Sequence, residues 1–225
     1  LHDLRGDDGA VIPAQIMQSE AANRQTITRL LFPITLAPGE LRAIRIVREA
    51  VGMPSRARAT MARLTAEGGA AFTDDGMQVA QQLLSLPRLD LIDDDTDNWS
   101  HGVDRFPDGP VTSPAWNAPM PVDAGPLMAS LLQTGRIGDS TLRAEWRVYA
   151  DRPFVELRLR VHWRAVKTVL KLTWAQLGDG PRLDGIPGGW LARPYTGREV
   201  PLRDWTRTEG GRGHTAIVSP HVYAL

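Results

Sequence analysis

The sequence contains no cysteine. This absence excludes disulfide bonds, thiol nucleophiles and thiolate-ligated zinc sites. With 225 residues, the chain is nevertheless long enough to bury a hydrophobic core without covalent cross-links. Its stability must therefore come from packing and from polar contacts between ordinary side chains.

An excess of charge of either sign is also lacking, since 26 basic residues balance 26 acidic residues and no basic run is visible. Nucleic acids are bound through clustered Lys and Arg, so no nucleic-acid partner is expected. No apolar run approaches the roughly 18 residues of a membrane span, so no membrane partner is expected either. We expect a soluble chain, cytoplasmic in preference to secreted; its oligomeric state stays open.

Alternation of apolar and polar residues dominates the second half of the chain. Apolar residues occupy every second position over most of 141–149, 154–163 and 169–174. Such a period predicts antiparallel strands with one buried and one solvated face, joined here by short turns into a meander. The sequence therefore predicts an all-β fold, a large antiparallel β-sandwich with few or no helices, as a single domain over residues 1–225.

The first half of the chain has weaker patterns. Residues 26–36 and 41–47 flank a Pro-Gly turn and are predicted to form a hairpin. Residues 56–64 fit a helix or a strand, and glycine-containing turns nearby favour strands. Two segments rich in proline and glycine, 103–126 and 178–213, are predicted to be mainly surface loops.

The densest chemistry lies in residues 93–102, which read Asp-Asp-Asp-Thr-Asp-Asn-Trp-Ser-His-Gly. Asp93, Asp95 and Asp97, with Asp104 at the twelfth position, resemble the ligand spacing of a calcium loop. However, the sixth position is not glycine and the twelfth is not glutamate. The interpretation we favour is that alternating aspartates leave a strand into a turn, with some of their side chains capping backbone N–H groups.

Other candidates for chemistry are His101 and the pair of Glu145 and Glu156. A histidine can ligate a metal or transfer protons, but no second histidine stands at ligand spacing, which favours a structural role for His101. Glu145 and Glu156 lie on the polar faces of neighbouring predicted strands, and two carboxylates flanking a glycosidic bond can hydrolyse it. The many arginines on the same strands favour a cross-strand ladder of ion pairs instead.

Tryptophan is abundant, with seven residues in 225. Trp146, Trp163 and Trp174 fall on apolar strand faces and are predicted to be core residues. The other four fall in or beside predicted loops, where an exposed indole can stack on a sugar ring or serve as a packed anchor; they are Trp99, Trp116, Trp190 and Trp205.

Several segments in series resemble the C-terminal β-region of the α-mannosidases of glycoside hydrolase family 38. The segment 97–102, Asp-Asn-Trp-Ser-His-Gly, resembles the family's Asp-Thr-Trp-Ser-His-Gly, and 149–163 followed by 170–172 resembles the strands that come after it. Ile186-Pro187-Gly188, then 193–201 and Trp205, are similar to a conserved loop of the family, and 9–15 resembles its early β-region. One departure is Gly188-Gly189, where the family has Phe-Gly.

The resemblance implies a galactose-mutarotase-like supersandwich. It also implies that this chain, which begins with Leu1, is the C-terminal part of a retaining, zinc-dependent α-mannosidase. The family's nucleophile, acid and zinc ligands belong mainly to an N-terminal domain, so no catalytic residue, metal or cofactor is expected here. The implied partners are that catalytic domain and an α-mannoside. The side chains expected at the substrate cleft or domain interface are Trp99, His101, Arg193, Glu199 and Trp205.

Two readings of the function follow. In the first, the chain is a non-catalytic β-domain that supports and walls the active site of the missing domain. In the second, motivated by the loop tryptophans, it is a free-standing, lectin-like carbohydrate-binding sandwich. For Arg193 and Glu199, an internal salt bridge is the alternative to a role at an interface.

Overall fold

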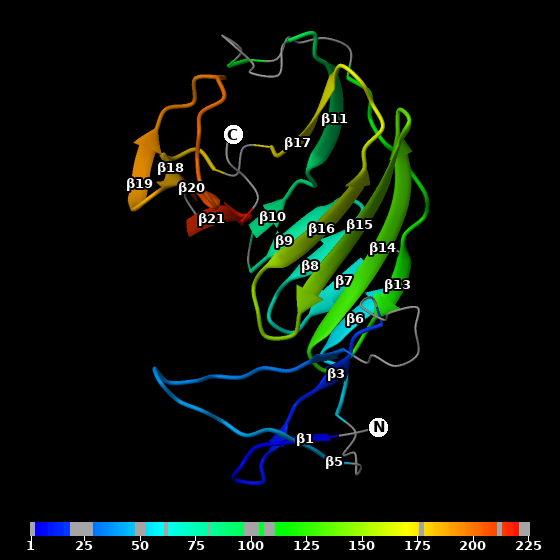
Figure 1. Cartoon of the computed structure of the whole chain (residues 1–225), viewed down its shortest axis with the longest axis vertical. Coiled ribbons are helices and arrows are strands. Elements are labelled where there is room, and N and C mark those ends of the chain that lie inside the picture. Colours follow the sequence, from blue (N-terminus) through cyan, green and yellow to red (C-terminus); the bar gives the residue numbers. More distant parts are fainter. Residues whose placement is uncertain are drawn as a thin grey trace. The chain divides into compact units, whose positions relative to one another are not determined.

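The computed structural model describes residues 3–18, 29–47, 53–60, 63–80, 82–96, 104–105, 111–175, 178–210 and 213–220. All regular elements in these ranges are β-strands, and the assigned strand pairs are antiparallel (Figure 1). The prediction of an all-β, antiparallel, sandwich-like fold with few or no helices is confirmed. No helix in the described ranges is long and apolar enough to cross a membrane.

The strands of the N-terminal part are β1 (Asp3–Arg5), β2 (Val11–Ile12), β3 (Gln15–Ile16), β4 (Leu30–Leu31), β5 (Arg45–Val47), β6 (Ala57–Thr60), β7 (Arg63–Ala66), β8 (Ala71–Thr73), β9 (Gly76–Val79), β10 (Gln82–Leu84) and β11 (Arg88–Asp93). The remaining strands are β12 (Ala115–Trp116), β13 (Met120–Asp123), β14 (Met128–Ile137), β15 (Ser140–Tyr149), β16 (Val155–His162), β17 (Thr168–Thr173), β18 (Arg182–Ile186), β19 (Gly189–Arg193), β20 (Trp205–Gly210) and β21 (Gly213–Val218).

Contacts divide the chain into two compact units, and each unit is assembled from three separate segments. The first unit comprises Leu1–Leu83, Trp116–Arg136 and Thr141–His162, and the second comprises Leu84–Ala115, Ile137–Ser140 and Trp163–Leu225. The prediction of a single domain stays a prediction.

The first unit contains a β-sandwich. One sheet has the order β10-β9-β8-β7-β6, and the other contains β14, β15 and β16 side by side, with β13 paired to β14 (Figure 1). Phe72 of β8 stacks on Trp146 of β15 with ring centroids 4.5 Å apart, which joins the facing sides of the two sheets. Trp146 is buried, as the alternation of β15 predicted, together with Leu142, Ala144 and Val148.

The opposite face of β15 corrects the prediction of a solvated side. Glu145 and Arg147 keep only 5% and 2% of their surface exposed. The polar face is therefore buried at these two positions, whereas Thr141 on the same face of β15 and Arg160 and His162 on β16 are exposed, as predicted. Alternation identified the two faces of the strand correctly, but it carries no information about what covers the second face.

The hairpin predicted around Pro38-Gly39 is also wrong. A turn is present, with Glu40 N–H donating to Ala37 O at 3.0 Å. The flanking strands find other partners, because β4 pairs with β3 and β5 pairs with β1. Leu41 beside the turn is 97% exposed, so these apolar positions do not form a shared buried face.

In the second unit, β17 pairs with β11 over six residues, with Arg88 opposite Thr173 and Asp93 opposite Thr168. The predicted meander is therefore confirmed for β15 and β16 and wrong for its third strand. Proximity in sequence favoured β16 as the partner of β17. The structure uses a strand about eighty residues earlier, a pairing that periodicity alone cannot assign.

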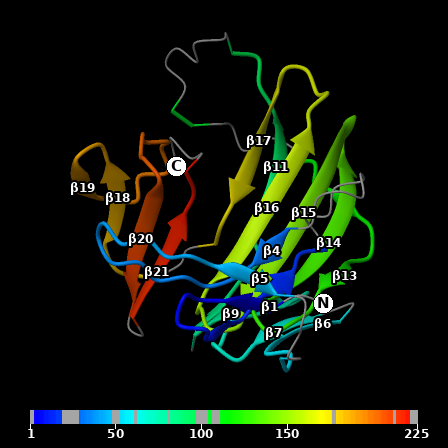
Figure 2. The same cartoon turned by 60° about the horizontal axis from the view of Figure 1, so that its bottom comes forward.

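The segment predicted as a loop over 178–213 forms most of a four-stranded sheet with the order β19-β18-β20-β21 (Figure 2). Its glycines and prolines mark turns between short strands: Gly188 has a φ of 82° at the hairpin from β18 to β19. Part of the predicted loop 103–126 is likewise strand β13, and the long strand β14 was not predicted from the sequence.

Candidate functional site

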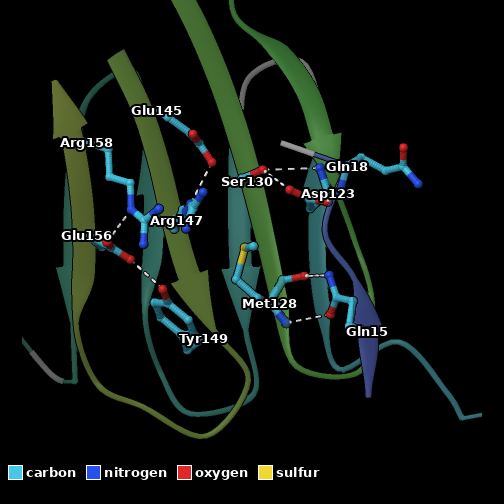
Figure 3. Close-up of polar contacts among 10 residues, drawn as sticks. All are labelled: Gln15, Gln18, Asp123, Met128, Ser130, Glu145, Arg147, Tyr149, Glu156 and Arg158. Carbon is cyan, nitrogen blue, oxygen red and sulfur yellow. Dashed lines mark hydrogen bonds and ion pairs between the residues drawn. The ribbon is translucent and has the colours of Figure 1, made fainter. Parts of the chain in front are cut away.

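A layer of polar side chains covers the face of β14, β15 and β16 that points away from the other sheet of the sandwich (Figure 3). Trp146 points into the sandwich, so its neighbours Glu145 and Arg147 must point to the opposite side. The members of this polar layer are Gln15, Asp123, Ser130, Glu145, Arg147, Tyr149, Glu156 and Arg158. It is the densest set of buried or half-buried polar contacts in the described part of the first unit.

Opposite charges alternate along and across the two strands of the layer. Glu145 stands opposite Arg158, and Arg147 stands opposite Glu156. Within β15, Arg147 Nε lies 2.5 Å from Glu145 Oε1, and within β16, Arg158 Nε lies 2.6 Å from Glu156 Oε1. Both glutamates therefore pair with an arginine, and these two ion pairs run along each strand; the cross-strand ladder that the arginines favoured stays a prediction.

Tyr149 of β15 links to β16 by donating its hydroxyl hydrogen to Glu156 Oε2. Burial of the ring, followed by the hydrogen bond to Glu156, raises the pKa of Tyr149 to about 12. The phenol therefore stays protonated at neutral pH and acts as a hydrogen-bond donor. The carboxylate of Glu156 is shared between Tyr149 and Arg158.

Gln15 ties the N-terminal segment to the edge of the same sheet. Its Nε2 donates to Met128 O at 2.8 Å, and its Oε1 accepts from the N–H groups of Leu127 and Met128 at 3.0 and 2.9 Å (Figure 3). A Cβ at Gly125 would come within 2.6 Å of Gln15 Cδ, so glycine is required beside this amide. The Gln15 amide thus forms with the backbone of Leu127 and Met128 the hydrogen bonds that an adjacent strand would otherwise form.

Asp123 makes a second link between the same elements. Its Oδ1 accepts from Gln18 N–H at 2.6 Å, and its Oδ2 accepts from Ser130 Oγ at 2.9 Å. Asp123 and Ser130 are both buried, so each bond replaces lost contacts with water. Together with Gln15, they fix the segment around β3 on the sandwich.

The two glutamates of the polar layer are both engaged by arginines. A general acid or base needs a free proton-accepting or donating position near its substrate. Glu145 and Glu156 instead face arginines at 2.5 and 2.6 Å, and Glu145 is buried. Arginine stays charged, so each of these carboxylates faces a permanent positive charge.

The described part of the Asp-rich stretch, residues 93–96, contains a backbone cap. Asp94 Oδ1 accepts from Thr96 N–H at 3.0 Å and from Thr96 Oγ1 at 2.6 Å. These two bonds, the hydroxyl first, lower the pKa of Asp94. Asp95 lies 3.7 Å from the Lys167 ammonium, at an exposed site. A cap of the expected kind is therefore present in this stretch, formed by Asp94, which is not one of the alternating aspartates.

Two predicted site residues, Trp99 and His101, lie outside the described residues, as does Asp97. Within the described ranges, no group of three or more His, Asp or Glu side chains is arranged to hold a metal ion. Asp104, the twelfth position of the calcium-like spacing, instead makes an ion pair with Arg198 at 3.0 Å.

Arg193 ends β19 beside the fully buried carboxylate of Asp184. Its Nε lies 3.3 Å from Asp184 Oδ2, and its Nη2 donates to Pro201 O at 3.0 Å. The same carboxylate accepts from Arg182 Nη2 at 2.8 Å and from Thr206 Oγ1 at 2.7 Å. Asp184 thus gathers two guanidinium groups and a hydroxyl on one face of the four-stranded sheet, an arrangement that the sequence did not reveal.

Glu199 forms an ion pair with Lys171 of β17. Its backbone N–H donates to Asp104 O at 2.6 Å, and Arg105 Nε donates to the nearby Gly197 O at 3.2 Å. Burial lowers the pKa of Lys171. The segment 193–201 is therefore held by ion pairs and backbone bonds within the second unit.

Trp205 begins β20, and its indole lies over Gly185 of β18. A Cβ at Gly185 would come within 2.7 Å of Trp205 Nε1, so only glycine leaves room for the ring. The structure does not bring Arg193, Glu199 and Trp205 into one cluster: the first contacts Asp184, the second Lys171 and the third Gly185. Arg193 and Glu199 both form ion pairs inside the second unit, as the alternative of an internal salt bridge predicted. Their role at an interface stays a prediction.

One further buried acid escaped the sequence analysis. Asp90 of β11 accepts from Arg88 Nε at 2.8 Å and Nη2 at 2.9 Å, and from Thr173 Oγ1 at 2.9 Å. The bonds from Arg88 lower the pKa of Asp90 most, with a smaller contribution from Thr173, while burial opposes the shift. The Arg-x-Asp spacing on one strand face was its only signal.

Comparison of the whole chain with known proteins found no family model that matches and no matching curated protein.

Proposed function

We propose that this chain is the C-terminal β-region of a retaining, zinc-dependent α-mannosidase of the family 38 type, with catalysis performed by a separate N-terminal domain. The observation that carries the proposal is the serial resemblance of residues 97–102, 149–163, 186–188, 193–201 and Trp205 to that region. The all-β, sandwich-like fold supports it, since the region it would represent is built of β-sheet.

The ion pairs of the polar layer support a non-catalytic role. Hydrolysis of a glycosidic bond needs two carboxyl groups that reach the substrate from opposite sides. Glu145 and Glu156 were the pair suggested by the sequence, and both are engaged by arginines. The described residues also do not fit a zinc site, so no step through zinc is assigned to this chain.

In the proposed role, this chain presents a fixed surface to the catalytic domain and to the α-mannoside. The segment 193–201 suits that task, because Lys171, Asp104 and Asp184 restrain its side chains and backbone. Arg193, Glu199 and Trp205 would then act by positioning the segment. Trp99 and His101 stay candidates for the same surface.

The test compares this chain with the longer product of its gene, using an aryl α-mannoside as substrate. We expect this chain alone to release no phenol with or without added zinc. We expect the longer product to hydrolyse the substrate with retention, and to lose activity when a chelator removes zinc. Hydrolysis by this chain alone, or an inactive longer product that is folded and zinc-loaded, would overturn the proposal.

A further inference from the structure

A row of polar residues crosses one face of the four-stranded sheet β19-β18-β20-β21 (Figure 2). The register places Arg193 opposite Arg182, Arg182 opposite Thr208, and Thr208 opposite Thr215. Residues directly opposite each other in an antiparallel pair point to the same face, so these four side chains are neighbours in one line. We call them the arginine row. Arg182, Thr208 and Thr215 keep only 8%, 5% and 9% of their surface exposed, so most of the row is buried.

Three hydrogen-bond donors of the arginine row lack an acceptor among the described residues. They are Arg193 Nε, Arg182 Nε and Thr208 Oγ1, and each is shielded from water. They come from the adjacent strands β19, β18 and β20, at directly opposite positions. A buried donor without an acceptor destabilises a fold, and native proteins nearly always supply one. Three such donors side by side indicate an acceptor that the described polypeptide does not provide.

The charge at the arginine row is unbalanced in the same direction. Arg182 Nη2 donates to Asp184 Oδ2 at 2.8 Å, and Arg193 Nε lies 3.3 Å from the same oxygen without a hydrogen bond to it. The second oxygen of Asp184 accepts from Thr206 Oγ1. In the described ranges, neither arginine forms an ion pair with another acid, so one buried carboxylate serves two guanidinium groups. One positive charge is left without compensation, close to the three free donors.

Donors and charge together select the class of ligand. A metal cation would be repelled by the two guanidinium groups. A water molecule or a neutral hydroxyl compound could accept from the donors, but it would leave the charge uncompensated. A small anion meets both requirements, because it carries negative charge and accepts several hydrogen bonds at once. The Arg193 side chain keeps 20% of its surface exposed, so the β19 end of the row is open to ions from solvent.

We propose that the arginine row binds a small inorganic anion of the chloride class, held by Arg193, Arg182 and Thr208. The anion accepts from donors on three adjacent strands, so it ties β19, β18 and β20 together at the start of the segment 193–201. This site goes beyond the proposed function, because an α-mannoside is neutral and the anion requires neither a catalytic domain nor hydrolysis.

The test titrates this chain with sodium chloride, with sodium gluconate added to keep the ionic strength constant. Constant ionic strength removes general screening, so only specific binding raises the thermal unfolding midpoint with chloride concentration. We expect a saturable rise in this midpoint. The ³⁵Cl NMR signal should broaden in the presence of the chain and sharpen again when bromide displaces chloride. Absence of a saturable rise, or of chloride broadening, would overturn the site.

Two variants test the donors separately. Thr208→Val keeps the side-chain shape and removes one hydroxyl, so the chloride dissociation constant should rise about tenfold, equivalent to about 1.4 kcal/mol. Arg182→Lys keeps the charge but removes the guanidinium N–H groups, and should abolish saturation. The matched control is Arg198→Gln, which removes a positive charge of the same unit from an exposed ion pair with Asp104, outside the row. It should bind chloride as the wild type does.

Circular dichroism in chloride-free buffer verifies that each variant is folded. If Arg182→Lys does not fold, Thr208→Val decides the question alone. Wild-type chloride affinity in folded Thr208→Val, or an equal loss of affinity in Arg198→Gln, would overturn the assignment of the donors. Neither result bears on mannosidase activity of the longer product, so the two proposals fail separately.

Discussion

Glu145 and Arg147 stand two residues apart on β15 and form a buried ion pair, with 2.5 Å between Oε1 and Nε. Removing one partner of such a pair leaves a charge without compensation in a place that water does not reach. Glu145→Ala should therefore lower the free energy of unfolding by about 3 kcal/mol, measured by urea denaturation. Replacing both residues, as Glu145→Leu with Arg147→Met, should recover most of that loss because both charges leave together.

The matched control is the ion pair of Glu40 and Arg42, which lies at the surface beside the turn at Gly39. Exposed pairs are screened by solvent, so Glu40→Ala should leave the urea midpoint unchanged within error. If Glu145→Ala were as harmless as Glu40→Ala, the buried role of the polar layer would be wrong.

The raised pKa of Tyr149 predicts a loss of stability at high pH. The hydroxyl titrates near 10 in the unfolded chain and at about 12 in the fold, so the folded state holds its proton more tightly. Its contribution is complete below pH 10 and disappears as the pH rises from 10 to 12. Because the ring is only partly buried, we expect about 1–2 kcal/mol.

Tyr149→Phe should remove this part of the alkaline slope, and unfolding followed at several pH values between 9 and 12 would measure it. The variant also frees Glu156 from one donor, so it should lose stability at neutral pH as well. Ultraviolet titration of the folded wild type should show one late-titrating tyrosine that is missing in the variant. An unchanged slope would contradict the assignment.

The lowered pKa of Asp90 predicts a loss of stability at low pH. Its bonds from Arg88, and then from Thr173, lower its pKa, so the folded state favours the ionised form. The resulting stability is present above the ordinary pKa of aspartate, near 4, and is lost as the pH falls through the lower value of the fold. Asp90→Asn should remove that acid dependence and cost about 1–2 kcal/mol at neutral pH.

Thr173→Val is the control for Asp90, because it deletes one hydrogen bond and leaves the charge in place. It should lower stability by about 1 kcal/mol without changing the acid slope. Equal slopes in Asp90→Asn and the wild type between pH 2 and 5 would show that another group sets the acid limit.

The sequence was informative where one residue type decides the structure. Alternation in 141–149 placed Trp146 in the core, and the Asp-rich stretch 93–102 predicted capping side chains, of which Asp94 is one. The other two tryptophans predicted for the core differ: Trp163 is 41% exposed just after β16 ends, and Trp174 is half-buried after β17. An apolar face in a sequence pattern indicates burial only while the strand keeps a neighbour.

The sequence did not predict which distant segments pair, because a period-two pattern does not identify the strand that a given strand pairs with. The pairing of β17 with β11 and the assembly of β18, β19, β20 and β21 depend on such choices. For the same reason residue spacing gave no indication of the role of Asp184. Its partners Arg182, Arg193 and Thr206 come together only when three strands align. A lone Asp between Leu and Gly gave no signal of its role.

Substitution of Asp184 therefore tests most directly how the segment 193–201 is held. Its fully buried carboxylate compensates Arg182 and lies 3.3 Å from Arg193 Nε, so Asp184→Asn should cost about 3 kcal/mol or more. Thr206→Val removes only the hydroxyl at 2.7 Å and should cost about 1 kcal/mol. Hydrogen exchange should show faster opening of the Arg203 amide, which donates to Gly185 O, in Asp184→Asn but not in Thr206→Val. Equal stability losses in the two variants would mean that the guanidinium groups do not depend on Asp184, and that Arg193 is free to act at a surface.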